Sequence, residues 1–300
     1  MRIFLILILL FAGARGGISQ ENKILEQILA GMKYHQSLLK TWKLNCILKG
    51  ETLKSRVPHK KGIHTYTQVW AQKGEKIYYE IKDNNGKTKS ICTFDGEILQ
   101  VWGANRKAII SVPQEKKIRS TFFNSRFTPF HLLYLLSGTE KPIFELLEEK
   151  DKIKNLRIYE EEMKGEECYV VEFAYVERFP FNSKIWEEVY EYTLWLDKNK
   201  NFLPLKKIMI WKQQGEIVLK VITTDITLQK FNNKIWFPVK AIQEGYVYNK
   251  GGEVRSHVIT EMELKNIEIN KGIPDSFFQI KFPKGTKVWD ERTGVSYIVK

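Results

Sequence analysis

The residues from Val189 to Trp211 constrain the fold of this chain more than any other stretch. Two runs of strand-forming residues, Val189–Asp197 and Phe202–Trp211, are separated by the four polar residues Lys198–Asn201. Two such runs on either side of a short polar link are typical of a β-hairpin. Each strand would be about 30 Å long at roughly 3.3 Å per residue. We therefore expect this hairpin at the centre of a large, curved sheet.

The rest of the chain continues the pattern. Residues alternate between apolar and polar from Trp42 onward, through short runs that end at Val112, and again from Leu156 to Ile269. Gly, Asn and Asp separate many of these runs, as turns with positive φ require. About eleven strands are too many for a flat open sheet. The pattern predicts a strongly curved antiparallel sheet that forms an incomplete, half-open β-barrel.

Three segments have the pattern of helices. Residues 21–39 carry apolar side chains at helical spacing, which predicts an N-terminal amphipathic helix. Thr128 and Pro129 form a helix start, and the run Phe130–Leu136 that follows is apolar on nearly every side. A shorter helix is expected within residues 142–155. We expect an α+β fold in which the N-terminal helix and these mid-chain lid helices cover the concave face of the sheet.

The first residues have the pattern of an export signal. Met1-Arg2 precedes an apolar run from Ile3 to Ala12, and a small-x-small motif ends at Ala14. The run is about half the roughly 20 residues that a membrane-spanning helix needs. We expect residues 1–19 to be a signal peptide, cleaved after Ala14 or near Ser19, and residues 20–300 to be one periplasmic domain.

The charge of the chain argues against a nucleic-acid partner. The net charge is +13, with 38 lysines and 10 arginines, and the lysines are scattered among glutamates rather than clustered. Two interpretations stay open: a solvated lysine-rich surface, or attraction to anionic lipid headgroups or an acidic protein. The latter implies peripheral contact with a membrane surface, or contact with an envelope protein through basic loops such as Arg56–Lys61.

No catalytic or metal-binding motif is present. The sequence lacks HExxH, GxSxG, a P-loop and GxGxxG, and neighbouring acidic residues in strands point to opposite faces. The three cysteines (Cys46, Cys92, Cys168) have no CxxC or Cys/His spacing; one disulfide or buried free thiols both remain open. We expect a protein that is not an enzyme and that uses no metal and no cofactor.

Large apolar residues along the strands and the lid either fill a core or line a cavity. We expect one alternating set of the hairpin, from Tyr190 to Leu196, to face the helices, and its complement, which includes Glu191 and Trp195, to face outward. The candidate ligand-binding residues are Phe130, Leu133, Leu136, Tyr190, Tyr192, Leu194, Trp42 and Leu44.

Several motifs occur in an order that resembles one family. They are an Ile24-Leu-Glu-Gln-Ile-Leu29 helix, Phe94-Asp-Gly-Glu97 before a strand ending in Val101-Trp102, Leu194-Trp-Leu-Asp197 followed by Leu203-Pro-Leu-Lys206, and Phe282-Pro-Lys-Gly-Thr-Lys-Val-Trp-Asp290. Together they resemble the outer-membrane lipoprotein carrier and sorting proteins (LolA/LolB-like).

The resemblance implies a periplasmic half-barrel whose helices close a hydrophobic cavity for acyl chains of lipids or lipoproteins. The expected role is therefore a non-enzymatic carrier in lipoprotein sorting or envelope lipid transport. A sensor or regulatory module on the same fold, with an envelope protein as partner, is the first alternative. An exported hydrolase is the second, although no nucleophile and base can be named for it.

Overall fold

The computed structural model describes residues 2–55, 62–114, 118, 121–122, 128–139, 141–181 and 184–300, with the backbone alone at 2–19, 181 and 184. The strands are β1 (Thr41–Lys54), β2 (Gly62–Lys73), β3 (Lys76–Lys82), β4 (Thr88–Phe94), β5 (Leu99–Gly103), β6 (Lys107–Ser111), β7 (Ile153–Met163), β8 (Glu166–Phe181), β9 (Lys184–Asp197), β10 (Pro204–Gln213), β11 (Glu216–Phe231), β12 (Ile235–Tyr248), β13 (Val254–Ile269), β14 (Lys287–Asp290) and β15 (Val295–Ile298). The helices are α1 (Arg2–Leu38), α3 (Pro129–Leu132), α4 (Ile143–Glu148) and the 3-10 helix η2 (Asp275–Phe278).

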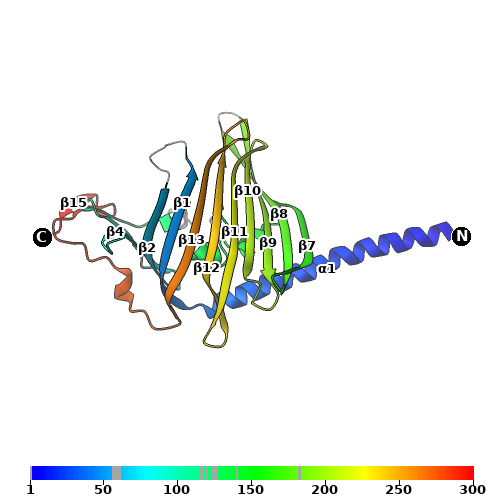
Figure 1. Cartoon of the computed structure of the whole chain (residues 1–300), viewed down its shortest axis with the longest axis horizontal. Coiled ribbons are helices and arrows are strands. Elements are labelled where there is room, and N and C mark those ends of the chain that lie inside the picture. The colour runs from blue at the N-terminus through cyan, green and yellow to red at the C-terminus, as the bar shows by residue number, and fades with distance from the viewer. Residues whose placement is uncertain are drawn as a thin grey trace.

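All fifteen strands belong to one sheet, in the order β15-β14-β6-β5-β4-β3-β2-β1-β13-β12-β11-β10-β9-β8-β7 (Figure 1). Neighbouring strands are antiparallel except for β6 and β14, which are parallel. The sheet curves without closing, because β15 and β7 form two separate edges. This confirms the predicted antiparallel half-barrel with helices on one face.

Two details of the predicted sheet are wrong. It has fifteen strands in the described residues rather than about eleven, and the C-terminal strands β14 and β15 extend it at one edge. The β9–β10 hairpin lies near the β7 edge, and the middle is held by β1, paired with β13 along most of its length.

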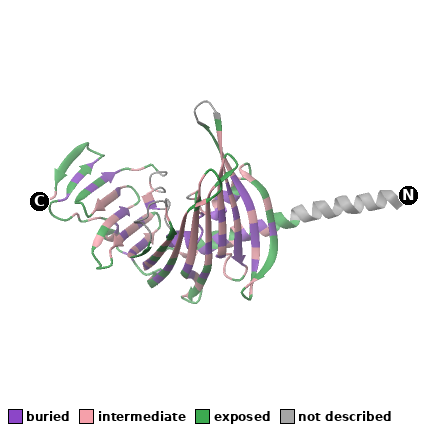
Figure 2. Cartoon of the chain, turned by 45° about the horizontal axis from the view of Figure 1, so that its top comes forward, coloured by how far each residue is buried: buried purple, intermediate pink, exposed green. Residues whose placement is uncertain are grey.

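The alternation of the strands sets which residues face the concave side. Tyr190, Tyr192 and Leu194 are buried in the main core together with the helices, while Trp195 packs in a separate cluster on the other face, with Leu205. The predicted inside and outside of this hairpin are confirmed. Figure 2 shows that burial is concentrated in the long strands, whereas β15 is exposed along its length.

Helix α1 closes the lower end of the half-barrel as drawn in Figure 1, where β9, β11 and β13 end. Leu25, Ile28 and Met32 are buried against the sheet and α4. His35 holds the end of the helix, since its Nε2 lies 2.7 Å from the carbonyl oxygen of Trp236 in β12. No helix in the described part of the chain is long and apolar enough to cross a membrane.

The three cysteines are buried free thiols. Burial raises the pKa of Cys168 to about 11, and the carboxylates of Asp197 and Glu166 add to this effect. Thiols with such pKa values are protonated at neutral pH and are therefore unreactive. The basic loop Arg56–Lys61, expected to contact a partner, lies outside the described residues.

The contact between α1 and the β9–β10 turn provides a test of the fold. A Cβ atom on Gly31 would lie 2.4 Å from Cδ2 of Phe202. We expect Gly31→Ala to lower the free energy of unfolding by about 1–3 kcal/mol, because the ring must move. Urea unfolding measures this. In a Phe202→Ala background the same change should instead stabilise by up to about 1 kcal/mol, since alanine favours a helix. Stabilisation by Gly31→Ala alone would contradict the observed packing.

Candidate ligand cavity and its lid

A lid segment, residues 128–149 apart from position 140, lies across the concave face. The predicted single helix over Phe130–Leu136 is wrong, because α3 ends at Leu132 and the chain then turns. The backbone N–H of Leu135 reaches back to the carbonyl of Phe130, and Leu135 forms a bridge with Pro142. The predicted second helix is confirmed as α4, whose apolar side chains are buried.

The lid is anchored by an aromatic cluster around Phe130. The Phe130 ring lies 5.0 Å from Trp42 in β1 and 5.6 Å from Trp70 in β2, both edge to face. Trp70 in turn stacks on Tyr79 in β3 at 4.1 Å. Contacts of this geometry add about 0.5–1.5 kcal/mol each to the burial of the rings. The first strands of the sheet and the lid therefore form one solid layer.

A buried lysine provides the second anchor. Lys207 in β10 points to the concave side, where its Nζ donates hydrogen bonds to the carbonyl oxygens of His131 and, at 3.0 Å, Leu135. Burial lowers the pKa of Lys207 to about 7. These two bonds satisfy carbonyls that a continuing helix would have paired, so Lys207 explains why α3 stops.

Further contacts fix the turn after α3. The Tyr192 hydroxyl donates to the carbonyl of Ser137 at 2.9 Å. Gly138 adopts φ +93°, and a Cβ there would lie 2.7 Å from the Tyr190 ring. Only glycine fits so close to the sheet in this conformation. Tyr134 hydrogen-bonds His35 of α1, which links the lid to the N-terminal helix.

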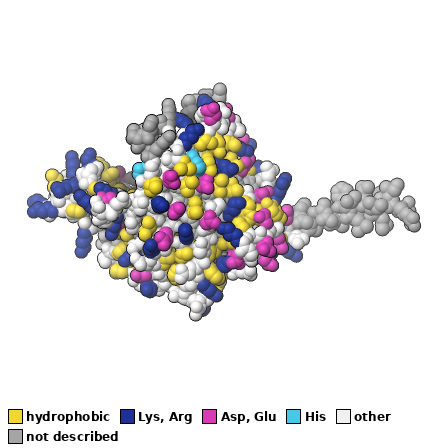
Figure 3. Space-filling view, in the orientation of Figure 1, with side chains coloured by type: hydrophobic (Ala, Val, Ile, Leu, Met, Phe, Trp, Pro, Cys, Tyr) yellow, Lys and Arg dark blue, Asp and Glu magenta, His cyan; other side chains and the backbone are white. Residues whose placement is uncertain are grey.

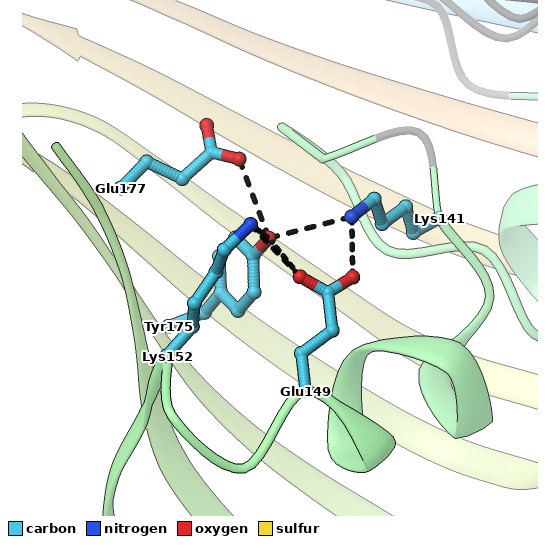
Figure 4. A network of polar contacts seen from close by, with 5 residues as sticks. All are labelled: Lys141, Glu149, Lys152, Tyr175 and Glu177. Carbon is cyan, nitrogen blue, oxygen red and sulfur yellow. Dashed lines mark hydrogen bonds and ion pairs between the residues drawn. The ribbon is translucent and has the colours of Figure 1, made fainter. Parts of the chain in front are cut away.

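A polar network ties the end of the lid to β8 (Figure 4). Glu149, just after α4, accepts hydrogen bonds from Lys141, from Lys152 at 2.9 Å and from the hydroxyl of Tyr175 at 2.9 Å. Partial burial alone would raise the pKa of Glu149, but these hydrogen bonds outweigh it and lower the pKa to about 2. Glu177 lies 3.3 Å from the same hydroxyl. Glu149 is therefore charged at neutral pH and holds the lid to the sheet.

Beyond the lid, the concave side contains a cavity of about 1090 Å³. It lies at the upper end in Figure 1, where β1, β3, β10 and β12 end. Its apolar lining consists of Leu48, Tyr66, Leu136, Tyr190, Met209, Trp211, Leu219, Val221 and Val258. The volume slightly exceeds the usual range for small-molecule sites of about 300–1,000 Å³.

The polar lining is asymmetric. The charged side chains Lys82, Asp83 and Lys89 all come from the β3–β4 hairpin, with Asn84 and Asn85 in its turn. Asp83 pairs with Lys89 at 3.0 Å. The opposite wall, from β9 to β11, is apolar and includes the aromatic rings of Tyr190 and Trp211. The cavity therefore has one polar side and one apolar side.

Trp211 on the apolar wall carries an unpaired polar group. Its indole Nε1 is buried and has no hydrogen-bond partner among the described residues. An unpaired buried donor costs about 1–3 kcal/mol. Its ring is nearly parallel to that of Tyr190, with centroids 6.1 Å apart.

The structure brings two of the eight candidate ligand-binding residues to the cavity, Leu136 and Tyr190. The other six (Phe130, Leu133, Tyr192, Leu194, Trp42 and Leu44) are packed in the solid core below it. Both interpretations of the apolar residues therefore apply, each to a different part of the concave face. Several other lining residues, such as Met209 and Trp211, lie near the ends of strands. In β10 they point to the concave side because Lys207, Met209 and Trp211 are alternate residues of one strand.

The described residues contain no cluster of His, Cys, Asp or Glu that could hold a metal ion. His131 borders the cavity, but its ring Nδ1 bonds the Thr128 hydroxyl at 2.8 Å. Burial and the nearby Lys207 charge lower the pKa of His131 to about 3, so it is neutral at physiological pH. It acts as a structural cap of α3.

A comparison with solved structures finds a protein with a similar fold. No protein-family model and no curated protein matches the chain. A DUF1329 family protein from Desulfovibrio piger ATCC 29098 has a TM-score of 0.51 and 14% identity, over 86% of this chain and 96% of that one. An uncharacterized conserved protein from Thermus thermophilus has a TM-score of 0.32 and 8% identity, over 89% and 98%. The first similarity concerns the fold alone.

The role of Lys207 can be tested through pH. Between pH 7 and about 10 the unfolded chain binds the Lys207 proton and the folded chain has lost it, so stability should rise with pH, by up to about 1.4 kcal/mol per unit. We expect the free energy of unfolding in urea to rise from pH 7 to 9.5, and Lys207→Met to remove this rise. The control is Lys206→Met, which removes the neighbouring lysine; the Nζ of Lys206 lies above the Trp195 ring on the other face of the sheet. This variant should still become more stable from pH 7 to 9.5. An unchanged slope in Lys207→Met would contradict the assignment.

Proposed function

We propose that this protein is a periplasmic, non-enzymatic carrier that holds acyl chains of a lipid or lipoprotein in the cavity above the lid. The observation that carries the proposal is the cavity itself, about 1090 Å³ in volume and walled by apolar strand residues on the concave face. The fold it shares with a DUF1329 protein supports the same conclusion. The task would be lipoprotein sorting or envelope lipid transport.

The asymmetry of the lining fits an amphiphile. An acyl chain would lie along the wall of Met209, Trp211 and Val221, and a polar group would lie toward the β3–β4 hairpin with Lys82 and Lys89. A purely apolar ligand would leave the lysines of this hairpin unused.

The expected affinity suits a carrier that must release its cargo. Burial of about ten methylenes at about 0.8 kcal/mol each supplies about 8 kcal/mol, which corresponds to micromolar binding. Association entropy reduces this figure.

A substitution that fills the cavity provides the direct test. Gly245 in β12 lines the cavity, has an ordinary backbone conformation, and has open space where a Cβ would lie. We expect Gly245→Trp to displace about three methylenes of a bound chain and to weaken binding of a fluorescent fatty-acid probe about fiftyfold. Probe titration, with phospholipid as competitor, measures this.

The matched control is Gly272→Trp. Gly272 also has open space at the Cβ position but lies outside the cavity, so this variant should bind the probe as the wild type does. Equal binding by Gly245→Trp and the wild type would place the probe elsewhere. Absence of probe binding by the wild type, together with absence of co-purified lipid in native mass spectrometry, would refute the carrier proposal.

Export is part of the same proposal and has its own test. The apolar run Ile3–Ala12 and the small residues before Ala14 predict cleavage by signal peptidase. Expressed with its own N-terminus in a Gram-negative host, the protein should appear in the periplasmic fraction and begin after Ala14 or near Ser19 by N-terminal sequencing. An intact Met1 in the cytoplasmic fraction would contradict it.

A further inference from the structure

The β6, β14 and β15 strands form a wing at the C-terminal edge of the sheet, and one face of this wing is exposed. Strand pairing aligns Lys287 with both Lys107 and Ile298, and Trp289 with Ile109. Paired positions on neighbouring strands share a face of a sheet, so these five side chains form one surface, which we call the wing patch. Its apolar members are 42% (Trp289), 41% (Ile109) and 65% (Ile298) exposed.

The opposite face of the wing is packed at β6 and β14, whereas Val295 and Tyr297 of β15 are exposed there. Ala108, Ile110 and Val288 form a small core there, against which Phe282 and Val299 lie. The wing therefore has a built interior and does not need the wing patch for its own folding. Exposed aromatic and aliphatic residues that are grouped in this way mark interaction surfaces.

The surroundings of the wing patch are basic. Residues 279–300 contain five lysine or arginine residues and two acidic ones, and Asp290 is already paired with Arg292 at 2.6 Å. Lys107 and Lys287 are exposed, and no ion pair to either occurs among the described residues. Figure 3 shows Lys and Arg side chains gathered at this C-terminal end of the molecule.

The combination of exposed apolar side chains with unpaired lysines fits an anionic lipid surface. Tryptophan is favoured at the level of lipid headgroups, and lysine stems bury along apolar surface while their charge stays in water. Each lysine near an anionic bilayer adds attraction that a neutral bilayer lacks. We propose that the wing patch docks the protein on the surface of an anionic lipid bilayer, with Trp289 and Ile298 at the headgroup level and Lys107 and Lys287 on lipid phosphates.

The wing patch lies on the cavity side of the sheet. Strand pairing continues its face from Ile109 through Val101 and Cys92 to Tyr79 and on to Trp70, which contacts the lid. The turn before β6 also touches the polar rim of the cavity, because the N–H of Ala104 donates to the carbonyl of Lys89 at 2.8 Å. A bilayer bound here would therefore meet the protein beside the polar side of the cavity.

Vesicle flotation tests the proposal with the purified full-length mature chain. Wild-type protein should float with phosphatidylcholine vesicles that contain about 30% phosphatidylglycerol, and its binding should fall steeply with salt. Lys107→Glu with Lys287→Glu should reduce the partition coefficient at least tenfold. Trp289→Ser with Ile298→Ser should reduce it about three- to tenfold while preserving the net charge.

A control with the same charge change separates the wing patch from bulk charge. Lys49 and Lys240 are exposed on strands β1 and β12 and point to the convex face, so Lys49→Glu with Lys240→Glu should retain most of the binding. Equal loss in this control would overturn the proposal, as would wild-type protein that fails to float. Light scattering that shows a dimer dissolved by Trp289→Ser would assign the wing patch to a second copy instead. All variants should keep wild-type probe binding in the cavity, which makes this outcome independent of the carrier proposal.

Discussion

Burial of the concave face is the constraint on which the rest of the structure depends. A half-open sheet with long strands exposes one continuous apolar surface, and such a surface must be covered. Helix α1 covers its lower end through residues such as Ile28 and Met32, and the lid covers its middle through Phe130. Among the described residues, the lid reaches the upper end only at its rim, through Leu136 and Gly138. The cavity is thus a direct consequence of a sheet that is longer than its cover.

The same lid that completes the core also shapes the cavity. Its three anchors differ in kind: aromatic packing at Phe130, hydrogen bonds from Lys207 to two carbonyls, and the charged network of Glu149. The aromatic anchor depends on burial, whereas the network at the surface depends on charge and is weakened by salt. The β8 and β10 contacts hold the chain on both sides of Gly138. Loosening either side would change the cavity wall without unfolding the layer beneath.

Much of the fold could be predicted from the sequence because strand alternation is a local property. The inward set of Tyr190 to Leu196 and the start of the lid at Thr128 follow from neighbouring residues alone. The central place of β1 could not be predicted, since it depends on pairing with β13, more than 200 residues away. The early end of α3 depends on Lys207, which is distant in sequence for the same reason. The cavity residues come from strand ends whose register only the folded sheet defines.

The distribution of charge connects the cavity with the exterior. The charged lining is confined to the β3–β4 hairpin, and the basic wing lies on the far side of β5 in the same sheet. Scattered lysines elsewhere alternate with glutamates, as Lys265 does with Glu263 at 3.1 Å, and cancel locally. A net field therefore remains mainly on the β3 to β15 side. If that side lies at the lipid headgroups, an amphiphile would pass from bilayer to cavity with its polar group among lysines. Its acyl chain would then not be exposed to water, and this exposure is the largest cost of transfer.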